Sequence, residues 1–285
     1  MIPHPKTEEC LQTLRHGKKV LPPTNERCAA PVTPEDINNT ARTLPTGKSP
    51  GPDRIPNKFY KTFASTIAPI LSQVINESRR RDRLPKGMSD GLITILYKKG
   101  ERDDPRNYRP ITLLNGDYKI MMRILAHRMN ESVVQWVSDT QTGFVPDAFI
   151  QENIMLLKSI QAHVENEDED AYFVFLDMEK AFDRCSWTFL VKALRELGYS
   201  PDFIKYITLA YSHENAPKRR IIVNGFLGPE FALGSGVAQG CPISPLLFLA
   251  FTEPLILRST PHKERTRHIR HQNRRPHLHP LMLRG

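Results

Sequence analysis

Ala171-Tyr-Phe-Val-Phe-Leu-Asp-Met-Glu-Lys-Ala-Phe-Asp183 is the stretch of this 285-residue sequence that most constrains the fold. Five apolar or aromatic residues, Tyr172 to Leu176, run directly into Asp177. An unbroken run of β-favouring residues predicts a strand that is buried on both faces. A carboxylate at the end of such a strand is costly to desolvate unless a cation or a hydrogen-bond donor lies against it. For Asp177 alone the simpler interpretation is a strand end that caps the next turn, so the rest of the chain must decide its role.

Length and composition favour a folded protein with one large domain or two small ones. Hydrophobic residues make up 39% of the chain and charged residues 25%, close to the globular average. The four cysteines form no CxxC pair, which argues against a zinc site or a disulfide framework and suits a reducing compartment. No signal-peptide pattern is present, and the longest apolar stretch, Leu246 to Leu257, is interrupted by polar residues and proline. We therefore expect an intracellular protein, nuclear or cytoplasmic, without a membrane partner.

The net charge of +9 suggests an anionic partner, but most of it belongs to one end of the chain. From Arg258 onward the sequence has eight Lys and Arg residues and one acidic residue, a charge of +7, which leaves +2 for the remainder. Global charge alone is therefore a weak argument for nucleic-acid binding by the rest of the protein.

The start of the sequence predicts irregular chain and then a helix. Residues 1–32 are polar and interrupted by prolines, so we expect no regular structure there. Thr33-Pro-Glu-Asp36 combines a capping hydroxyl, a first-turn proline and acidic residues near the positive end of the helix dipole. The helix should run to about Leu44.

Next comes a segment from Leu44 to Asp53 that is too rich in proline and glycine for a helix or a strand. It carries Lys48, and two interpretations stay open, a plain connector and a loop held close to phosphates. From Ile55 to about Arg80 apolar residues recur at helical spacing, which predicts one or two helices with a break near Pro69.

The remainder predicts short strands among helices, an α+β arrangement. Asn224-Gly225 favours a hairpin turn within Ile221–Phe226. A loop rich in glycine and proline, Gly234–Pro245, precedes an apolar helix. The other expected elements are a strand at Leu92–Tyr97 followed by Asn107–Thr112, and helices at Tyr118–Val137, Ile150–His163, Ser186–Leu197 and Ser200–Tyr211.

Taken together, these segments resemble a reverse transcriptase of the non-LTR, LINE-type retrotransposon kind. Five pieces occur in the family's order and spacing, and the resemblance covers roughly residues 33–257. They are Gly47-Lys-Ser-Pro-Gly-Pro-Asp53, Asn107-Tyr-Arg-Pro-Ile111, Gln141-Thr-Gly-Phe144, Phe175-Leu-Asp-Met-Glu-Lys-Ala-Phe-Asp183 and Gly236-Val-Ala-Gln-Gly-Cys-Pro-Ile-Ser-Pro-Leu-Leu-Phe248. Any one piece is weak because short motifs arise by chance, but five in order are specific.

The resemblance implies a right-hand polymerase with fingers and palm that copies RNA into DNA. A primer 3′-hydroxyl would attack a deoxynucleotide triphosphate, with two Mg²⁺ ions held by carboxylates at the reacting phosphate. In this family Asp177 would be the first carboxylate ligand, and the backbone carbonyl of Met178 would face the same metal. Phe182 would abut the sugar and disfavour a ribose 2′-hydroxyl, although plain core packing is a compatible alternative.

The resemblance also implies contacts with the nucleotide and the template. Gln239 and Gly240 match a loop under the nascent base pair. Arg109 matches a cation that grips the triphosphate, where a guanidinium fork suits phosphate oxygens. Lys48, Lys98 and Lys99 are weaker candidates for nucleic-acid contact. For Asp183 a structural role is favoured over metal ligation.

The sequence also departs from the family's pattern. Ala238 stands where the family commonly has a cation, and the last aspartate of the chain is Asp202, so the paired aspartates expected after Leu257 are missing. The domain interpretation is therefore an irregular segment at 1–32, a partial fingers and palm at 33–257, and an Arg/His/Pro-rich tail at 258–285. We expect that tail to be disordered or frameshift-derived, and polymerase activity to be weak or absent. The alternative is a non-catalytic remnant that binds nucleic acid, partly through a basic tail.

Overall fold

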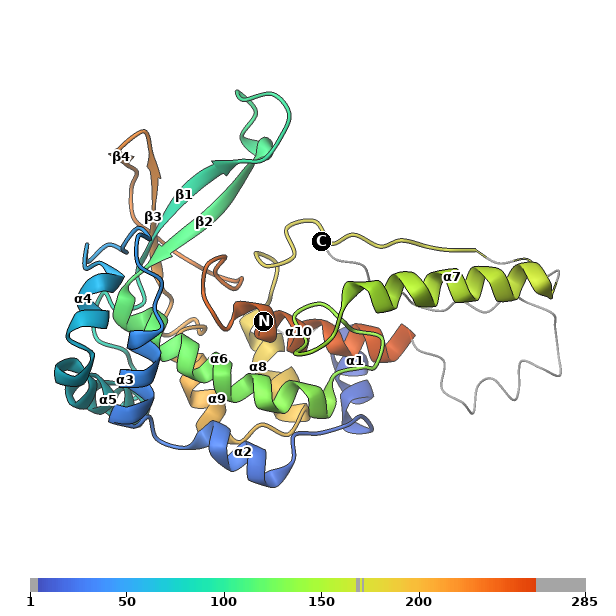
Figure 1. Ribbon diagram of the computed structural model, residues 1–285, viewed down its shortest axis with the longest axis horizontal. Helices are drawn as coiled ribbons and strands as arrows, with labels where there is room; N and C mark the ends of the chain where they lie inside the picture. The colour runs from blue at the N-terminus through green and yellow to red at the C-terminus, as the bar shows by residue number, and fades with distance from the viewer. Residues whose placement is uncertain (1–4, 168–169, 171, 260–285) are drawn as a thin grey trace.

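The computed structural model of the protein describes residues 5–167, 170 and 172–259. Several of its helices pack around one long helix, α7 lies apart from that helix, and a small mixed sheet rises from the helical body (Figure 1). The helices are α1 (Pro5–Arg15), α2 (Pro22–Ala29), α3 (Pro34–Arg42), α4 (Asn57–Thr62), α5 (Ala64–Arg80), α6 (Gly116–Trp136), α7 (Ile150–Asn166), α8 (Trp187–Glu196), α9 (Pro201–Thr208) and α10 (Ser244–Ser259), with a 3₁₀ turn at Pro105–Asn107. The strands are β1 (Gly91–Tyr97), β2 (Tyr108–Leu114), β3 (Lys218–Val223), β4 (Phe226–Leu227) and β5 (Phe231–Ala232). The expected α+β class is confirmed.

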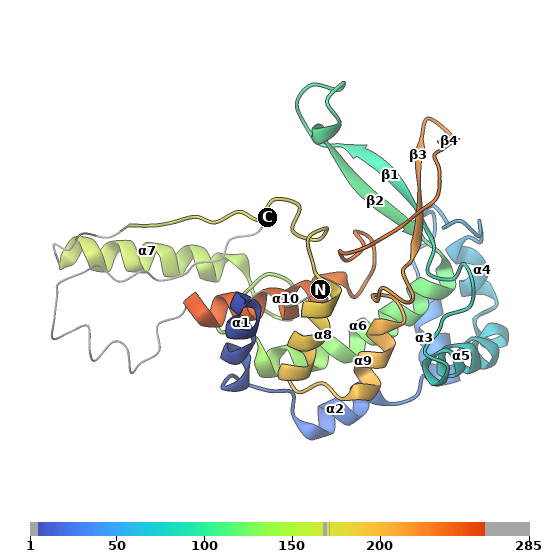
Figure 2. The same ribbon diagram turned by 180° about the vertical axis from the view of Figure 1, so that it is seen from behind.

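Helix α6 forms the centre of the core. Its apolar residues recur on more than one face, and Ile120, Leu125, Met129 and Val133 are all fully buried. Helices α2, α3 and α10 pack against it, and both views show it running through the middle of the helical body (Figures 1 and 2). A helix that is apolar on several sides is stable only when it is surrounded in this way.

The sheet has the order β2-β1-β3-β4, with β5 also paired to β3. Strands β1 and β2 form an antiparallel hairpin, whereas β1 and β3 are parallel, with Gly91 opposite Arg219. The predicted turn joins β3 to β4, since Asn224 and Gly225 both have positive φ (51° and 82°), as a type I′ turn requires. The hairpin prediction at Ile221–Phe226 is therefore confirmed.

The expectation of irregular chain at residues 5–32 was wrong. Prolines begin both helices there, and a proline in the first helical turn gives up an amide that no helix could use. Leu11 and Leu14, three positions apart on α1, are buried where α1 packs against α8 and α10. Prolines that looked like interruptions in the sequence thus mark helix starts.

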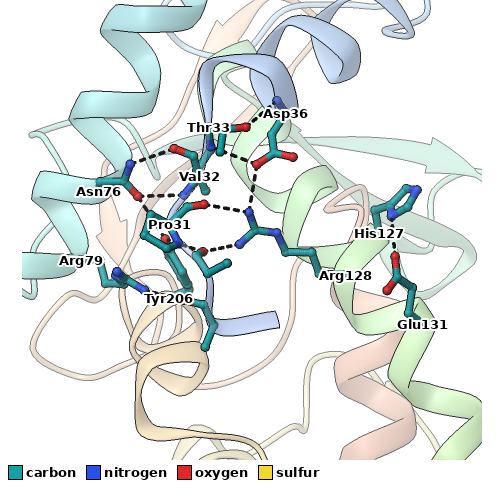
Figure 3. Close-up of polar contacts among 12 residues, drawn as sticks. Pro31, Val32, Thr33, Asp36, Asn76, Arg79, His127, Arg128, Glu131 and Tyr206 are labelled. Carbon is teal, nitrogen blue, oxygen red and sulfur yellow. Dashed lines mark hydrogen bonds and ion pairs between the residues drawn. The ribbon is translucent and has the colours of Figure 1, made fainter. Parts of the chain in front are cut away.

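A polar clamp, defined here as Asn76, Arg79, Arg128 and Tyr206, fixes the linker between α2 and α3 (Figure 3). The guanidinium of Arg128 donates to the carbonyls of Ala30 and Pro31 and to Asp36 Oδ2. The Asn76 side chain accepts from the Val32 amide and donates to the Val32 carbonyl. Arg79 donates to the Ala29 carbonyl. The Tyr206 hydroxyl lies within hydrogen-bond distance of Asn76 Oδ1 and of the Ala30 carbonyl. The clamp joins α5, α6 and α9 through one short stretch of backbone.

The predicted helix caps are present, but the predicted break between two helices lies at another residue. The capping box at Thr33 and Asp36 is present, and Ser186 and Ser200 cap α8 and α9 as expected. The break within residues 55–80 lies at Phe63, not at Pro69, which α5 accommodates in its interior. Phe63 closes α4 with φ −102° and ψ 25°, so the break comes from a local backbone departure rather than from the proline.

The predicted buried strand before Asp177 was also wrong. Residues 172–176 belong to no helix or strand, they pair with none of the strands that the structure describes, and they are 41–72% exposed. An apolar run favours β conformation but cannot supply the neighbouring strand that would bury it. Residue 171 and the tail from residue 260 lie outside the described residues. Among the described helices none is both long and apolar enough to cross a membrane.

Candidate functional site

The site is built around the turn that follows the exposed run. Lys180 has φ 52°, and its carbonyl accepts from the amides of Asp183 and Arg184, which closes the turn. The Phe182 carbonyl accepts from the Val237 amide at 2.9 Å, and the Cys185 carbonyl accepts from the Gly236 amide at 2.8 Å. The turn is therefore hydrogen-bonded to the loop at residues 234–240, which the sequence had singled out separately.

The same loop also contacts β2. The Thr112 amide donates to the Gln239 carbonyl at 2.9 Å. Gly240 has φ +107°, and a Cβ at this position would lie 2.8 Å from the Thr112 carbonyl oxygen. Glycine is required here both by the backbone conformation and by the close approach. The loop thus bridges β2, which carries Arg109, and the turn that carries Phe182.

Phe182 lies in an aromatic cluster at the edge of an apolar cavity. Its ring stacks on Phe248 of α10, with centroids 5.1 Å apart and planes 19° apart. Phe144 approaches its edge at 6.5 Å and 84°. A cavity of about 380 Å³ adjoins the cluster and is also lined by Leu176 and Met178. Phe182 and Met178 therefore share one cavity, whereas Asp177 is exposed and does not line it.

A second cavity, of about 300 Å³, lies between the sheet and the loop at 234–239. Asp183 and Arg219 both line it. Burial raises the pKa of the Asp183 carboxyl and lowers the pKa of the Arg219 guanidinium. Arg219 is 1% exposed; its Nη1 donates to the carbonyls of Ser89 and Lys218, while Nε and Nη2 have no partner among the described residues. This buried cation was not predicted from the sequence. Its position opposite Gly91 depends on the pairing of β1 with β3, which only the structure shows.

The predicted basic residues are all exposed and are spread over two parts of the fold. Arg109 lies on β2 opposite Leu96, on the projecting part of the β1–β2 hairpin (Figure 1). Lys98 and Lys99 follow β1, and the Lys98 amide donates to the Asn107 carbonyl, so these cations share one hairpin. Lys48 lies apart from them in the loop between α3 and α4.

The carboxylates do not form a metal site by themselves. Asp177 is exposed, and Asp183 belongs to the wall of the second cavity. Within residues 5–167, 170 and 172–259 no three His, Cys, Asp or Glu residues come together as metal ligands. Mg²⁺ requires oxygen ligands in near-octahedral geometry, and a pair of ions requires several shared carboxylates. The described residues therefore do not fit a two-metal centre.

Comparison with known proteins identifies the family. Residues 96–270 match the family model described as reverse transcriptase (RNA-dependent DNA polymerase), more than half of the chain. The chain belongs to the reverse transcriptase family. The match includes β2 with Arg109, the turn with Phe182 and the loop with Gln239 and Gly240, so the segments that contact one another in the structure all lie within the matched range.

The relatives of the reverse transcriptase domain come from retrotransposable elements. It is 29% identical over 89% of its length to the "Transposon TX1 uncharacterized 149 kDa protein" of Xenopus laevis. It is 28% identical over 79% to the "Probable RNA-directed DNA polymerase from transposon BS" of Drosophila melanogaster, and 28% over 78% to a Pol polyprotein from the type-2 retrotransposable element R2DM of the same species. These alignments cover 19%, 25% and 20% of the relatives, so the chain spans about a fifth to a quarter of their length. The expected family, a LINE-type reverse transcriptase domain, is confirmed.

Proposed function

We propose that this chain is the nucleotide- and template-binding part of an RNA-directed DNA polymerase, with fingers and a partial palm, and that on its own it has little or no polymerase activity. The observation that carries the proposal is the loop at 234–240, which is hydrogen-bonded on one side to β2 and on the other to the turn bearing Phe182. In this arrangement RNA template, DNA primer and deoxynucleotide triphosphate would meet along the loop.

Each residue has a distinct part in this proposal. Arg109 offers a guanidinium fork to phosphate oxygens from the projecting hairpin, and Lys98 and Lys99 add charge beside it. Gln239 and Gly240, whose backbone is held against β2, would lie under the nascent base pair. Phe182 faces the sugar, where its ring leaves no room for a 2′-hydroxyl. Lys48 is a further candidate for contact with the nucleic-acid backbone.

The weak activity follows from the carboxylates. In relatives with a two-metal mechanism the bound ions would stabilise the attacking and leaving oxygens. Here Asp177 is exposed, and among the described residues no group of three His, Cys, Asp or Glu side chains comes together, which supports the expectation that the chain by itself does not hold such a pair. By itself the chain would therefore bind and orient the nucleic acid and the nucleotide without carrying out the chemical step.

Primer extension tests the activity. With the full chain, an RNA template, a DNA primer and Mg²⁺, we expect extension at or near background. Robust Mg²⁺-dependent extension that is abolished in Asp177→Ala would contradict the proposal.

Nucleic-acid binding tests the positive part. Fluorescence anisotropy with a labelled RNA–DNA primer-template should show binding that persists in Asp177→Asn and weakens severalfold in Arg109→Gln. Arg42→Gln, the same charge change on the exposed end of α3, is the matched control. Equal losses in Arg109→Gln and Arg42→Gln would indicate charge alone and overturn the assignment of the hairpin. Binding that survives Arg109→Gln but falls on deletion of residues 258–285 would favour the alternative, a non-catalytic remnant that binds through its tail.

A further inference from the structure

We propose that Phe248 and Phe144 are positioning residues that hold the ring of Phe182 in place, and that they thereby set how strictly the protein rejects a nucleotide with a 2′-hydroxyl. The inference rests on the proposed function, in which Phe182 faces the sugar. It adds two residues, from segments far apart in the sequence, whose contact with Phe182 only the structure reveals.

The two contacts restrain different motions of the ring. Phe248 covers one face of Phe182 in a nearly parallel stack, at 5.1 Å and 19°. Phe144 meets it edge to face, at 6.5 Å and 84°. Because the Phe182 carbonyl is already bonded to the Val237 amide, the backbone is fixed and the side-chain torsions are the main freedom left. A stack restrains rotation about the Cα–Cβ bond, and the perpendicular ring restrains the tilt.

Phe248 is itself held by its surroundings. It lies on α10 between Leu247 and Leu249, both buried, and its ring also stacks on Phe251 at 6.4 Å and 21°. Phe251 in turn contacts Phe189 of α8 at 5.2 Å. A side chain on a buried helix with packed neighbours is a rigid support for a residue that must be placed accurately.

Phe144 is held by its own loop. Its φ is 60°, a left-handed conformation that a bulky residue adopts only when its surroundings impose it. The loop is fixed by a buried hydrogen bond from Asn153 Nδ2 to Thr142 Oγ1 at 2.9 Å, and by the Gly143 amide donating to Gln141 Oε1. The Gln141–Phe144 motif thus has a structural task, which is to hold an aromatic ring perpendicular to that of Phe182.

The apolar cavity gives the ring of Phe182 an alternative position. The space of about 380 Å³ beside Phe182 is lined by the same three phenylalanines, so the ring has room to swing away once a neighbour is shortened. An aromatic pair of this kind changes an equilibrium by roughly two- to tenfold. Loss of the Phe248 stack should therefore lower the preference for a deoxynucleotide over a ribonucleotide by a similar factor.

The test compares Phe248→Leu with Phe251→Leu, the same change on the same helix at a ring that contacts Phe248 and Phe189. With primer-template present, the affinities for dATP and ATP are measured by titration. The Phe182 ring is followed by ¹⁹F NMR of protein labelled with fluorophenylalanine, its signal assigned through Phe182→Leu. We expect Phe248→Leu to reduce the dATP-to-ATP affinity ratio roughly two- to tenfold and to move the Phe182 signal. Phe251→Leu, which removes only an indirect support of Phe182, should have a clearly smaller effect on both, and equal effects of the two variants would count against the inference.

The outcomes separate the two proposals. A Phe182 signal that moves in Phe248→Leu while the affinity ratio stays at the wild-type value overturns the inference and leaves nucleotide binding intact. Wild-type protein that binds neither nucleotide, or both equally, overturns the proposed role of Phe182 itself, and the inference with it. Phe144→Leu, in a more exposed loop, covers the case in which Phe248→Leu fails to fold; an unchanged ratio in that variant also counts against the inference.

Discussion

At the scale of single residues, several polar groups are buried, which costs free energy of desolvation, and Glu253 is one of them. Glu253 of α10 is fully buried; Ser138 Oγ donates to its Oε1, and its Oε2 has no partner among the described residues. Burial raises the pKa of this carboxyl to about 7. In the unfolded chain the pKa of a glutamate carboxyl is about 4.3. The carboxyl of Glu253 therefore keeps its proton to a higher pH in the folded state than in the unfolded chain.

The sign of the resulting pH dependence is fixed by that difference. The folded state holds a proton that the unfolded chain has released, so the Glu253 contribution is fully present below the unfolded pKa and is lost as pH rises toward 7. Glu253→Gln should therefore be the more stable protein at pH 8, by at most about 4 kcal/mol, and nearly equal to wild type at pH 4. Urea unfolding at the two values measures this. Glu152→Gln, an exposed glutamate on α7, is the control, and a pH-independent difference for Glu253→Gln would contradict the prediction.

Gly240 gives a second prediction at this scale. Gly240→Ala adds a Cβ at 2.8 Å from the Thr112 carbonyl oxygen and at a φ of +107°. Gly47→Ala meets the same backbone restriction, with φ +76°, but has open space around the added Cβ. We expect about 1 kcal/mol of destabilisation at Gly47 and about 2–3 kcal/mol at Gly240, together with weaker nucleotide binding in Gly240→Ala only. Equal unfolding midpoints for the two variants would show that the loop at 234–240 can move away from β2 without loss of stability.

At the scale of elements, local chemistry predicted helix starts well and long-range partners poorly. Thr33, Ser186 and Ser200 cap helices because their hydroxyls satisfy amides a few residues away, and this is visible in the sequence. The linker between α2 and α3 was not predictable, because its clamp comes from Asn76 and Arg128, which lie far along the chain.

Arg128 is expected to be the most important member of the clamp. Arg128→Met removes the guanidinium that bonds two linker carbonyls and Asp36, and should destabilise the fold by about 2–3 kcal/mol. Amide hydrogen exchange at residues 29–33 should accelerate. Arg123→Met, on the same helix and outside the clamp, is the matched control. If exchange in the linker is equal in both variants, the clamp does not hold the linker.

At the scale of the whole molecule, the exposed run at 172–176 stands out. Its five apolar or aromatic residues are exposed and form no strand in the described part of the chain, and an exposed apolar run of this kind favours association. We expect concentration-dependent self-association of the purified chain. Val174→Lys should reduce it, whereas Ile70→Lys, at an equally exposed but isolated apolar residue of α5, should not. Size-exclusion chromatography with light scattering measures the mass; the same mass distribution for both variants would rule out this run as the cause.

The sequence predicted the class of the fold and the family, and it predicted the segments of the site without their contacts. The loop at 234–240 and the turn at Phe182 were recognised by motif, while their hydrogen bonds through Val237 and Gly236 required the structure. The strand before Asp177 was mispredicted because strand formation depends on a partner that local composition does not report. Arg219 escaped notice because a strand arginine is ordinarily exposed.

The parallel pairing of β1 with β3 has a consequence for how the protein is made. Gly91 and its partner Arg219 are separated by 128 positions (219 − 91). The β1–β2 hairpin is complete at Leu114, 104 positions before β3 begins at Lys218 (218 − 114). At a synthesis rate of about 5–20 residues per second, the hairpin would therefore be made roughly 5 to 20 s before its neighbour exists. During that interval one edge of β1 is open to other chains. Nascent chains that end between residues 115 and 218 are therefore the most vulnerable to association with other chains, and we expect chaperones to capture them at this stage.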